Sequence, residues 1–326
     1  YYYILLDSFG RIPYTEDGTY VNVSQSEPWE IWKKLILTLE LEAPNLPINI
    51  DNNHGRCTQG MAYTLLARLY LNATSFGVTP TNNGISISSE NEFYNRCVTS
   101  CQKVIDSRAY TIEYDFFTNF AIHNEYSKEN IFTIVEDGTT NNERDQYSCK
   151  NKLRICYLSL HYKFQTRFNM KLDCWNGFVA RPQFMEIYNN RDVRGAGDRK
   201  GTMTNEQFAW FLGPLCTEKG DTIADNDGTP IVIVPEVESL DAANRVDGAR
   251  MYKYEIDKTG TYTYMENDFV LFRYADVILM KKEALLRGGQ DDAPGIENTA
   301  VDAIKKRAFA YEADPIATFD QTYPDA

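Results

Sequence analysis

Apolar residues recur every three or four positions in two neighbouring stretches of the first third of the chain. The first stretch covers residues 58–73, where alanines stand among large side chains in one apolar stripe. The second covers residues 91–106 and follows Ser89 and Glu92, which have the spacing of a capping box. We expect two helices, joined by the polar residues 79–89 into an antiparallel hairpin. Such hairpins are the units of tetratricopeptide-like scaffolds.

Helical periodicity also occurs before and after this hairpin. Residues 27–43 follow Ser26, a residue type favoured as an N-cap, and Pro44 predicts the helix end. Residues 272–287 precede two glycines, and residues 297–310 form a further apolar stripe. The sequence therefore predicts a mainly α fold built from helical pairs.

The middle of the chain lacks this periodicity. Residues 110–112 and 130–135 have the composition of short strands. Residues 136–268 are rich in Gly, Asn, Asp and aromatic residues, and residues 314–326 show no clear element. Long irregular segments inside a compact protein commonly carry function. We expect a single domain over residues 1–326, with a helical scaffold at about 27–110 and 270–311 and an irregular, partly β, ligand-binding insertion at about 136–268.

Charge and hydropathy narrow the classes of partner. The 326 residues carry a net charge of −13, with no Lys/Arg cluster in the sequence to offset it. This acidity disfavours nucleic acid and anionic membrane surfaces as main partners. No apolar run approaches the length of a membrane span. The chain opens on six apolar or aromatic residues, without an initiator Met, signal peptide or lipobox, so we expect the native protein to begin earlier.

Several segments together resemble one family. Residues 55–71, GRCTQGMAYTLLARLYL, resemble the G-R-A-T-K-G-A-A-x-A-L-L-A-R-L-Y-L helix of the SusD/RagB family, the nutrient-binding outer-membrane lipoproteins of Bacteroidetes. Five shorter pieces appear in that family's order, at residues 9–13, 104–110, 129–132, 191–194 and 272–280. Together these pieces span most of the chain.

The resemblance implies a SusD-like fold with tetratricopeptide-like helical pairs and an irregular ligand-binding region. It also implies a role as surface lid and glycan receptor for a SusC-like, TonB-dependent transporter. The expected location is the cell surface at the outer membrane, with attachment through an N-terminal lipid that is absent from this chain. The family's lipidated N-terminal portion and its E-R-x-x-E-x-x-x-E segment have no counterpart here, so we expect N- and C-terminal parts to be lacking.

The irregular region contains side chains suited to binding a neutral glycan. Aromatic faces stack on the apolar sides of sugar rings, and amide or guanidinium groups bind the hydroxyls. Trp175 offers such a face and Asn176 such an amide, ahead of a D-x-R motif that ends at Arg194. Trp210 and Tyr147 lie in the same region. We predict these five residues as ligand contacts, against the alternative that Trp175 is half-buried in a turn and that other aromatic rings pack locally.

Catalysis and metal binding have weaker support in the sequence. Glycosidases use two carboxylates, and Asp173, Glu186, Asp192 and Asp198 are acids of the irregular region, but acids are common in an acidic protein. No nucleophile, zinc or phosphate-loop motif occurs. Residues 225–228 resemble the start of a calcium loop without its final Glu, which favours a turn. We expect no enzyme and no cofactor, and a structural calcium ion is unsupported.

The sequence thus favours a non-catalytic receptor that binds glycan or oligosaccharide nutrients at the bacterial outer surface for delivery to a transporter. The alternative is a helical-repeat adaptor, which would bind another protein through Leu and Tyr side chains on its inner helix faces. A glycosidase is a third hypothesis.

Overall fold

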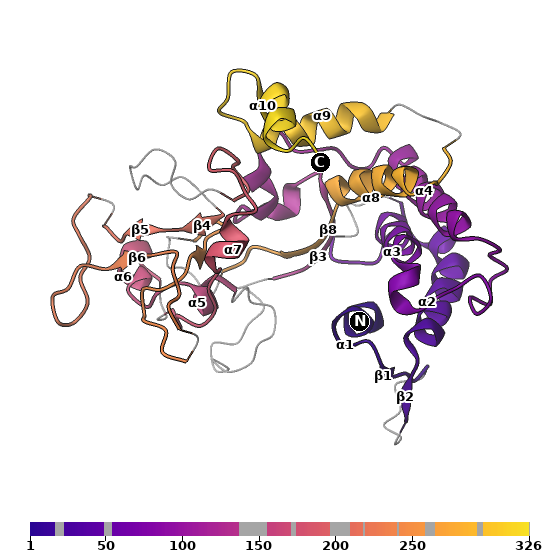
Figure 1. Ribbon diagram of the computed structural model, residues 1–326, viewed down its shortest axis with the longest axis horizontal. Coiled ribbons are helices and arrows are strands. Elements are labelled where there is room, and N and C mark those ends of the chain that lie inside the picture. The colour runs from indigo at the N-terminus through magenta and orange to yellow at the C-terminus, as the bar shows by residue number, and fades with distance from the viewer. Residues whose placement is uncertain are drawn as a thin grey trace. The chain divides into compact units, whose positions relative to one another are not determined.

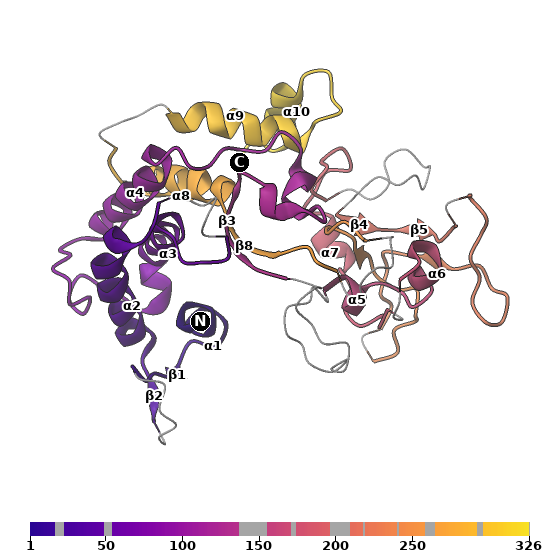
Figure 2. The same ribbon diagram turned by 180° about the vertical axis from the view of Figure 1, so that it is seen from behind.

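The computed structural model describes residues 1–16, 23–48, 54–136, 155–170, 174–195, 209–217, 219–239, 241–257, 265–291 and 296–325. The chain divides into two compact units (Figures 1 and 2). Unit 1 comprises residues 1–112 and 272–301, and unit 2 comprises residues 113–271 and 302–326.

Unit 1 is a helical layer. Its helices are α1 (Tyr2–Phe9), α2 (Pro28–Glu42), α3 (Gln59–Leu71), α4 (Glu90–Asp106) and α8 (Tyr274–Leu286), and the first turns of α9 (Ile296–Ala308) also belong to it. Short 3-10 turns, η1 (Ala43–Asn45) and η2 (Ala73–Phe76), follow α2 and α3, and β1 (Ile12–Pro13) pairs antiparallel with β2 (Gln25–Ser26). Helices α3, α4 and α8 pack against one another (Figure 1). The predicted hairpin of residues 58–73 and 91–106 is therefore present.

A buried tryptophan joins α2, α3 and α4. Trp32 of α2 is fully buried, and its indole N–H donates to the carbonyl of Leu69, 2.8 Å away. The rings of Tyr70 and Phe93 meet it edge-on, with centroids 6.0 and 5.9 Å distant. Edge-to-face aromatic packing adds to the stabilisation from apolar burial, so this contact fixes how α2, α3 and α4 sit together.

The structure corrects three local predictions in unit 1. The N-cap of α2 is Glu27 and not Ser26, because Glu27 and Glu30 form the reciprocal capping box. At α4, the carboxylate of Glu92 accepts the N–H and hydroxyl of Ser88, so the box predicted with Ser89 does not form. Residues 110–112 form no strand. Tyr110 is instead buried against Gly60 of α3, where an added Cβ would clash with its ring.

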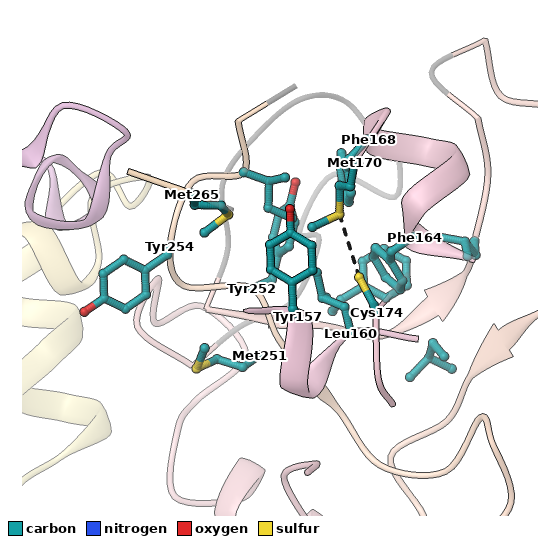
Figure 3. Close-up of a cluster of buried hydrophobic side chains, with 14 of the residues drawn as sticks. Tyr157, Leu160, Phe164, Phe168, Met170, Cys174, Met251, Tyr252, Tyr254 and Met265 are labelled. Carbon is teal, nitrogen blue, oxygen red and sulfur yellow. Dashed lines mark hydrogen bonds between the residues drawn. The ribbon is translucent and has the colours of Figure 1, made fainter. Parts of the chain in front are cut away.

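Unit 2 is built from short elements around an aromatic core. Its turns and helices are η3 (Phe116–Phe120), η4 (Asn124–Tyr126), α5 (Ile155–Ser159), α6 (Phe164–Phe168), α7 (Pro182–Met185), the end of α9 and α10 (Pro315–Thr322). The strand pairs are β3 (Asn130–Ile134) with β8 (Phe269–Arg273), β4 (Trp210–Phe211) with β7 (Arg250–Met251), and β5 (Gly213–Pro214) with β6 (Val232–Ile233). Figure 3 shows the core, in which Phe164, Phe168 and Tyr252 stack.

The C-terminal residues contradict the expectation of no clear element. Helix α10 begins at Pro315, and the side chain of Asp314 caps it by accepting the N–H of Ala317. Phe319 then packs against Phe309. The helix has only eight residues, too few for its apolar period to stand out in the sequence.

A buried ion pair joins the two chain segments of unit 2, residues 113–271 and 302–326. Arg307 donates to both carboxylate oxygens of Glu129, at 2.9 Å for the Nη2 to Oε1 contact, and both residues are buried. Glu129 also accepts the N–H of Glu113 and the side-chain amide of Asn119. The pair is thus bidentate and surrounded by further hydrogen bonds, as a buried ion pair requires.

Candidate functional site

The turn at Trp175 is fastened to the end of α5. The N–H of Trp175 donates to the carbonyl of Tyr157, and the N–H of Gly177 donates to the carbonyl of Leu158, each at 2.7 Å. The N–H of Asn176 also donates to the carbonyl of Leu160, which follows α5. Carbonyls in the last turn of a helix have no partner within the helix, and here the turn satisfies them. Its backbone is therefore held at three consecutive residues.

The sequence of this turn matches its backbone. Asn176 has a φ of 54°, a left-handed conformation that asparagine adopts more readily than most residues. At Gly177 an added Cβ would lie 2.8 Å from the carbonyl oxygen of Leu158, so a side chain would force the turn to move. Cys174, just before the turn, is buried beside Met170 (Figure 3). The turn accordingly starts from an anchored residue and needs the order Asn-Gly.

The indole of Trp175 lies in solvent although its backbone is fixed. Its side chain is 63% exposed, whereas most large aromatic residues of unit 2 are buried or half-buried. The amide oxygen of the adjacent Asn176 is enclosed and has no hydrogen-bond partner within the described structure. An exposed ring on a fixed backbone loses little conformational freedom when a ligand stacks on it. The structure therefore leaves the Trp175 ring, on a fixed backbone, accessible to a flat ligand.

Trp210 lies in a second, partly exposed aromatic cluster. It is half-buried on β4, and its ring meets that of Phe184 edge-on at a centroid distance of 5.5 Å. Phe184 is 42% exposed and also contacts Tyr188. Phe184 could not be singled out from the sequence, because nothing in the pattern around α7 indicates which rings face solvent.

Arg194 and Tyr147 complete the predicted set. The guanidinium of Arg194 is bound to both carboxylate oxygens of Asp192, a buried residue that also accepts the phenol of Tyr323. About a quarter of the Arg194 side chain is exposed. Tyr147 lies outside the described residues. The Arg194 guanidinium also lies 6.0 Å from the centre of the Tyr188 ring. The structure thus links Arg194 to Trp210 through Tyr188 and Phe184, whereas Trp175 and Asn176 are neighbours in their own turn.

Comparison with known proteins identifies the family. The sequence model of the SusD family matches residues 128–322. The chain belongs to the SusD family.

Solved structures share the fold. A SusD superfamily protein from Parabacteroides distasonis is 18% identical, with a TM-score of 0.63 over 99% of this chain and 62% of that one. Surface glycan-binding protein A from Bacteroides thetaiotaomicron, in complex with laminarihexaose, is 17% identical, with a TM-score of 0.63 over 99% and 62%. A structure with a xylogluco-oligosaccharide is 17% identical, with a TM-score of 0.64 over 98% and 60%. None of the curated proteins compared with the chain matches it.

These comparisons confirm the SusD/RagB resemblance and the mainly helical fold predicted from the sequence. The chain spans 62%, 62% and 60% of the lengths of the three solved SusD-like structures named above. Among the described helices, none is both long and apolar enough to cross a bilayer.

The acids considered for catalysis occupy different surroundings in this SusD family member. Asp192 is buried in its pair with Arg194, and Glu186 is exposed. Asp173 and Asp198 lie outside the described residues. In the part of the chain that the structure describes, no three His, Cys, Asp or Glu side chains are grouped to hold a metal ion.

Residues 225–228 form the turn that the sequence favoured over a calcium loop. The N–H of Gly228 donates to the carbonyl of Asp225 at 3.0 Å, and the N–H of Asp225 donates to the carbonyl of Thr229 at 2.8 Å. The side chain of Asp227 accepts the N–H of Thr229. These bonds close the segment on itself.

Another carboxylate pair lies at the ends of β3 and β8. Asp268 is buried, and its two oxygens accept the N–H of Glu136 and the hydroxyl of Thr133. Burial, reinforced by the charge of Asp268, raises the pKa of Glu136 to about 7. Glu136 therefore changes its charge near neutral pH.

Unit 1 contains a separate concave feature. A pocket of about 320 Å³ is lined by α2, α3 and α4, through Glu40, Tyr63, Leu66, Tyr70, Arg96, Thr99, Ser100 and Lys103. The phenol of Tyr70 donates to Glu40, and the ammonium of Lys103 lies 4.6 Å from the centre of the Tyr63 ring. This mixture of apolar and charged groups is typical of a surface that binds polar ligands or peptides.

Proposed function

We propose that the chain is a non-catalytic glycan-binding protein in which Trp175 is the principal ligand contact. The observation that carries the proposal is the 63% exposure of this indole on a turn held by three backbone hydrogen bonds. Sugar rings present an apolar face to an aromatic side chain, and Asn176 is proposed as the neighbouring contact. Membership of the SusD family, and the relative solved with laminarihexaose, support the same class of ligand.

The remaining proposed contacts are Trp210, Arg194 and Tyr147. Trp210 offers a second ring, next to the exposed Phe184. Arg194 keeps part of its guanidinium accessible while Asp192 holds the group in place. Tyr147 is proposed from the sequence alone. In this scheme residues 136–268 bind the ligand, and the helical segments at about 27–110 and 270–311 are the scaffold of one SusD-like domain.

The wider role that we propose is capture of glycan nutrients at the surface of the outer membrane. The protein would pass them to a SusC-like, TonB-dependent transporter and would be attached to the membrane by an N-terminal lipid. Family membership supports this role.

Titration calorimetry with a panel of soluble neutral oligosaccharides tests the proposal. At least one glycan should bind, and Trp175→Ala should weaken its binding about tenfold or more, as expected when an exposed stacking platform is removed. Tyr114→Ala is the matched control, because Tyr114 is an 88% exposed aromatic residue of the same unit and should leave the affinity unchanged. Reducing ends should stay constant during incubation. Absence of binding to every glycan, or release of sugar, would contradict the proposal.

The alternative function, a protein adaptor, is favoured by the pocket between α2, α3 and α4. Its Tyr63, Leu66 and Tyr70 are the kind of inner-face side chains that such an adaptor would use. If this alternative holds, a protein partner should protect α3 and α4 from hydrogen exchange, and glycans should leave tryptophan fluorescence unchanged. Quenching of fluorescence by a glycan that Trp175→Ala abolishes would decide for the glycan receptor.

A further inference from the structure

Basic side chains gather around one histidine of unit 2, although the chain carries a net charge of −13. Three cations, Arg250, Arg245 and Lys163, act on the imidazole of His161, together with the carboxylate of Asp225. Asp227 and Asp247 also lie in this neighbourhood, so its charges balance locally, in contrast to the acidity of the whole chain. An anionic ligand therefore meets less repulsion here than from the chain as a whole.

Arg250 is the buried cation of this group. The residue lies on β7 and is 1% exposed, and its guanidinium donates to the carbonyl of Arg245. Its Nε is buried without an acceptor, and no carboxylate of the described residues forms an ion pair with it. Burial lowers the pKa of Arg250 to about 10, against the opposing charge of Asp247. Asp247 acts on Arg250 without a direct ion pair, so it compensates the buried positive charge only in part.

His161 adds an unfilled hydrogen-bond donor beside Arg250. Its Nδ1 accepts the N–H of Lys163 at 3.2 Å, so the neutral ring carries its proton on Nε2. Nε2 is buried and has no partner within the described structure. Burial, followed by the positive charge of Arg250, lowers the pKa of His161 to about 4. The ring therefore stays neutral at physiological pH.

Tyr162 lies beside His161 and is half-buried. Its ring stacks on that of His161 with a centroid distance of 4.4 Å. The Lys163 ammonium lies 5.5 Å from the centre of the Tyr162 ring and the Arg245 guanidinium lies 5.9 Å from it. The Arg245 side chain is 68% exposed. Its guanidinium lies 3.7 Å from the carboxylate of Asp225, which is long for an ion pair. The Tyr162 phenol donates to the carboxylate of Asp225, and the Lys163 ammonium donates to the amide oxygen of Asn226. The ring and the two cations beside it match a sugar ring that carries an acid.

We propose that the surface formed by Tyr162, Lys163 and Arg245 binds the anionic group, a carboxylate or a sulfate, of an acidic glycan. The inference rests on the proposed glycan binding and specifies the class of glycan. The sugar ring stacks on Tyr162, and its anionic group pairs with the two surface cations. The buried Arg250 strengthens the attraction of the anionic group, because charges interact more strongly in the protein interior than in water.

Matched pairs of oligosaccharides test the role of the charge. Tetragalacturonate and its methyl ester share one backbone and differ in the charge of the carboxylates. A sulfated galactan tetrasaccharide and its desulfated parent share one backbone and differ in the charge of the sulfates. Calorimetry should show at least one acidic member binding about tenfold more tightly than its neutral partner. The difference should shrink when salt is raised, because exposed charges are screened. The two pairs distinguish carboxylate from sulfate as the anionic group.

Surface variants test the location. Lys163→Gln and Arg245→Gln should each weaken binding of the acidic member about two- to fivefold, the range expected for one exposed ion pair, and leave the neutral member unchanged. Lys219→Gln is the matched control, because Lys219 is an exposed cation of the same unit. Asp227→Asn removes an exposed carboxylate near Asp225 and should strengthen binding slightly.

The outcomes separate this inference from the proposed function. Equal binding of acidic and neutral members would overturn the inference and leave glycan binding intact. A preference for acid that survives both Lys163→Gln and Arg245→Gln would overturn the assigned surface. Absence of binding to acidic and neutral glycans alike would overturn both proposals.

Discussion

Replacing Arg307 by methionine should destabilise unit 2 by about 3 kcal/mol. The substitution keeps the apolar length of the side chain and removes its charge. Glu129, which is fully buried, would lose both hydrogen bonds from the guanidinium and would keep those from Glu113 and Asn119. Breaking a buried pair by removing one partner costs about 3–5 kcal/mol. The two remaining donors place the expected cost at the lower end of that range.

Urea unfolding followed by tryptophan fluorescence measures this cost, since Trp175 and Trp210 both belong to unit 2. The matched control is Arg191→Met, because the contact of Arg191 with Glu312 is partly exposed at 3.4 Å and should contribute less than about 1 kcal/mol.

A double-mutant cycle with Glu129→Gln isolates the coupling between the two buried charges. The double variant should lose less free energy of unfolding than the sum of the single variants. The reasoning would be refuted if Arg307→Met cost less than about 1 kcal/mol, or if the two single costs simply added.

Three further changes follow from the site and its surroundings. The folded-state pKa of Glu136, about 7, lies above the ordinary 4.5. Its contribution to stability is therefore present below pH 4.5 and is lost as pH rises to about 7, by on the order of 1–3 kcal/mol. Glu136→Gln should abolish this fall in stability, measured by urea titrations at pH 5 and 8. The folded-state pKa of His161, about 4, lies below the ordinary 6.5, so its contribution to stability is lost as pH falls from 6.5 to 4. His161→Gln should flatten the dependence of the unfolding free energy on pH in that range. An unchanged dependence would contradict the assignment. Gly177→Ala should weaken glycan binding several-fold in the calorimetric titration, because its Cβ would displace the turn from Leu158; an unaltered affinity would show that the turn geometry is not required.

The helical part of the fold could be predicted because its signals are local. Thr58 caps α3 through the N–H of Met61, as its residue type suggests, and the apolar stripes of α3 and α4 meet in the packed hairpin. The missed elements are those whose stability comes from distant contacts. Helix α10 depends on Phe319 packing against Phe309, and Tyr110 lies against Gly60.

The candidate site could be predicted only in part. The Trp-Asn-Gly sequence indicates a turn with an aromatic residue, but the exposure of Trp175 depends on carbonyls of α5 that hold the turn. The basic group around His161 could not be predicted, because Arg250 lies far from it in sequence. They come together where the N–H of Met251 donates to the hydroxyl of Ser159.

The location of a bound sugar tests the central claim most directly. A crystal structure of the protein with the oligosaccharide that binds most tightly in the titrations should show a sugar ring lying parallel to the indole of Trp175. A sugar bound elsewhere, with the Trp175 ring still in solvent, would contradict the account.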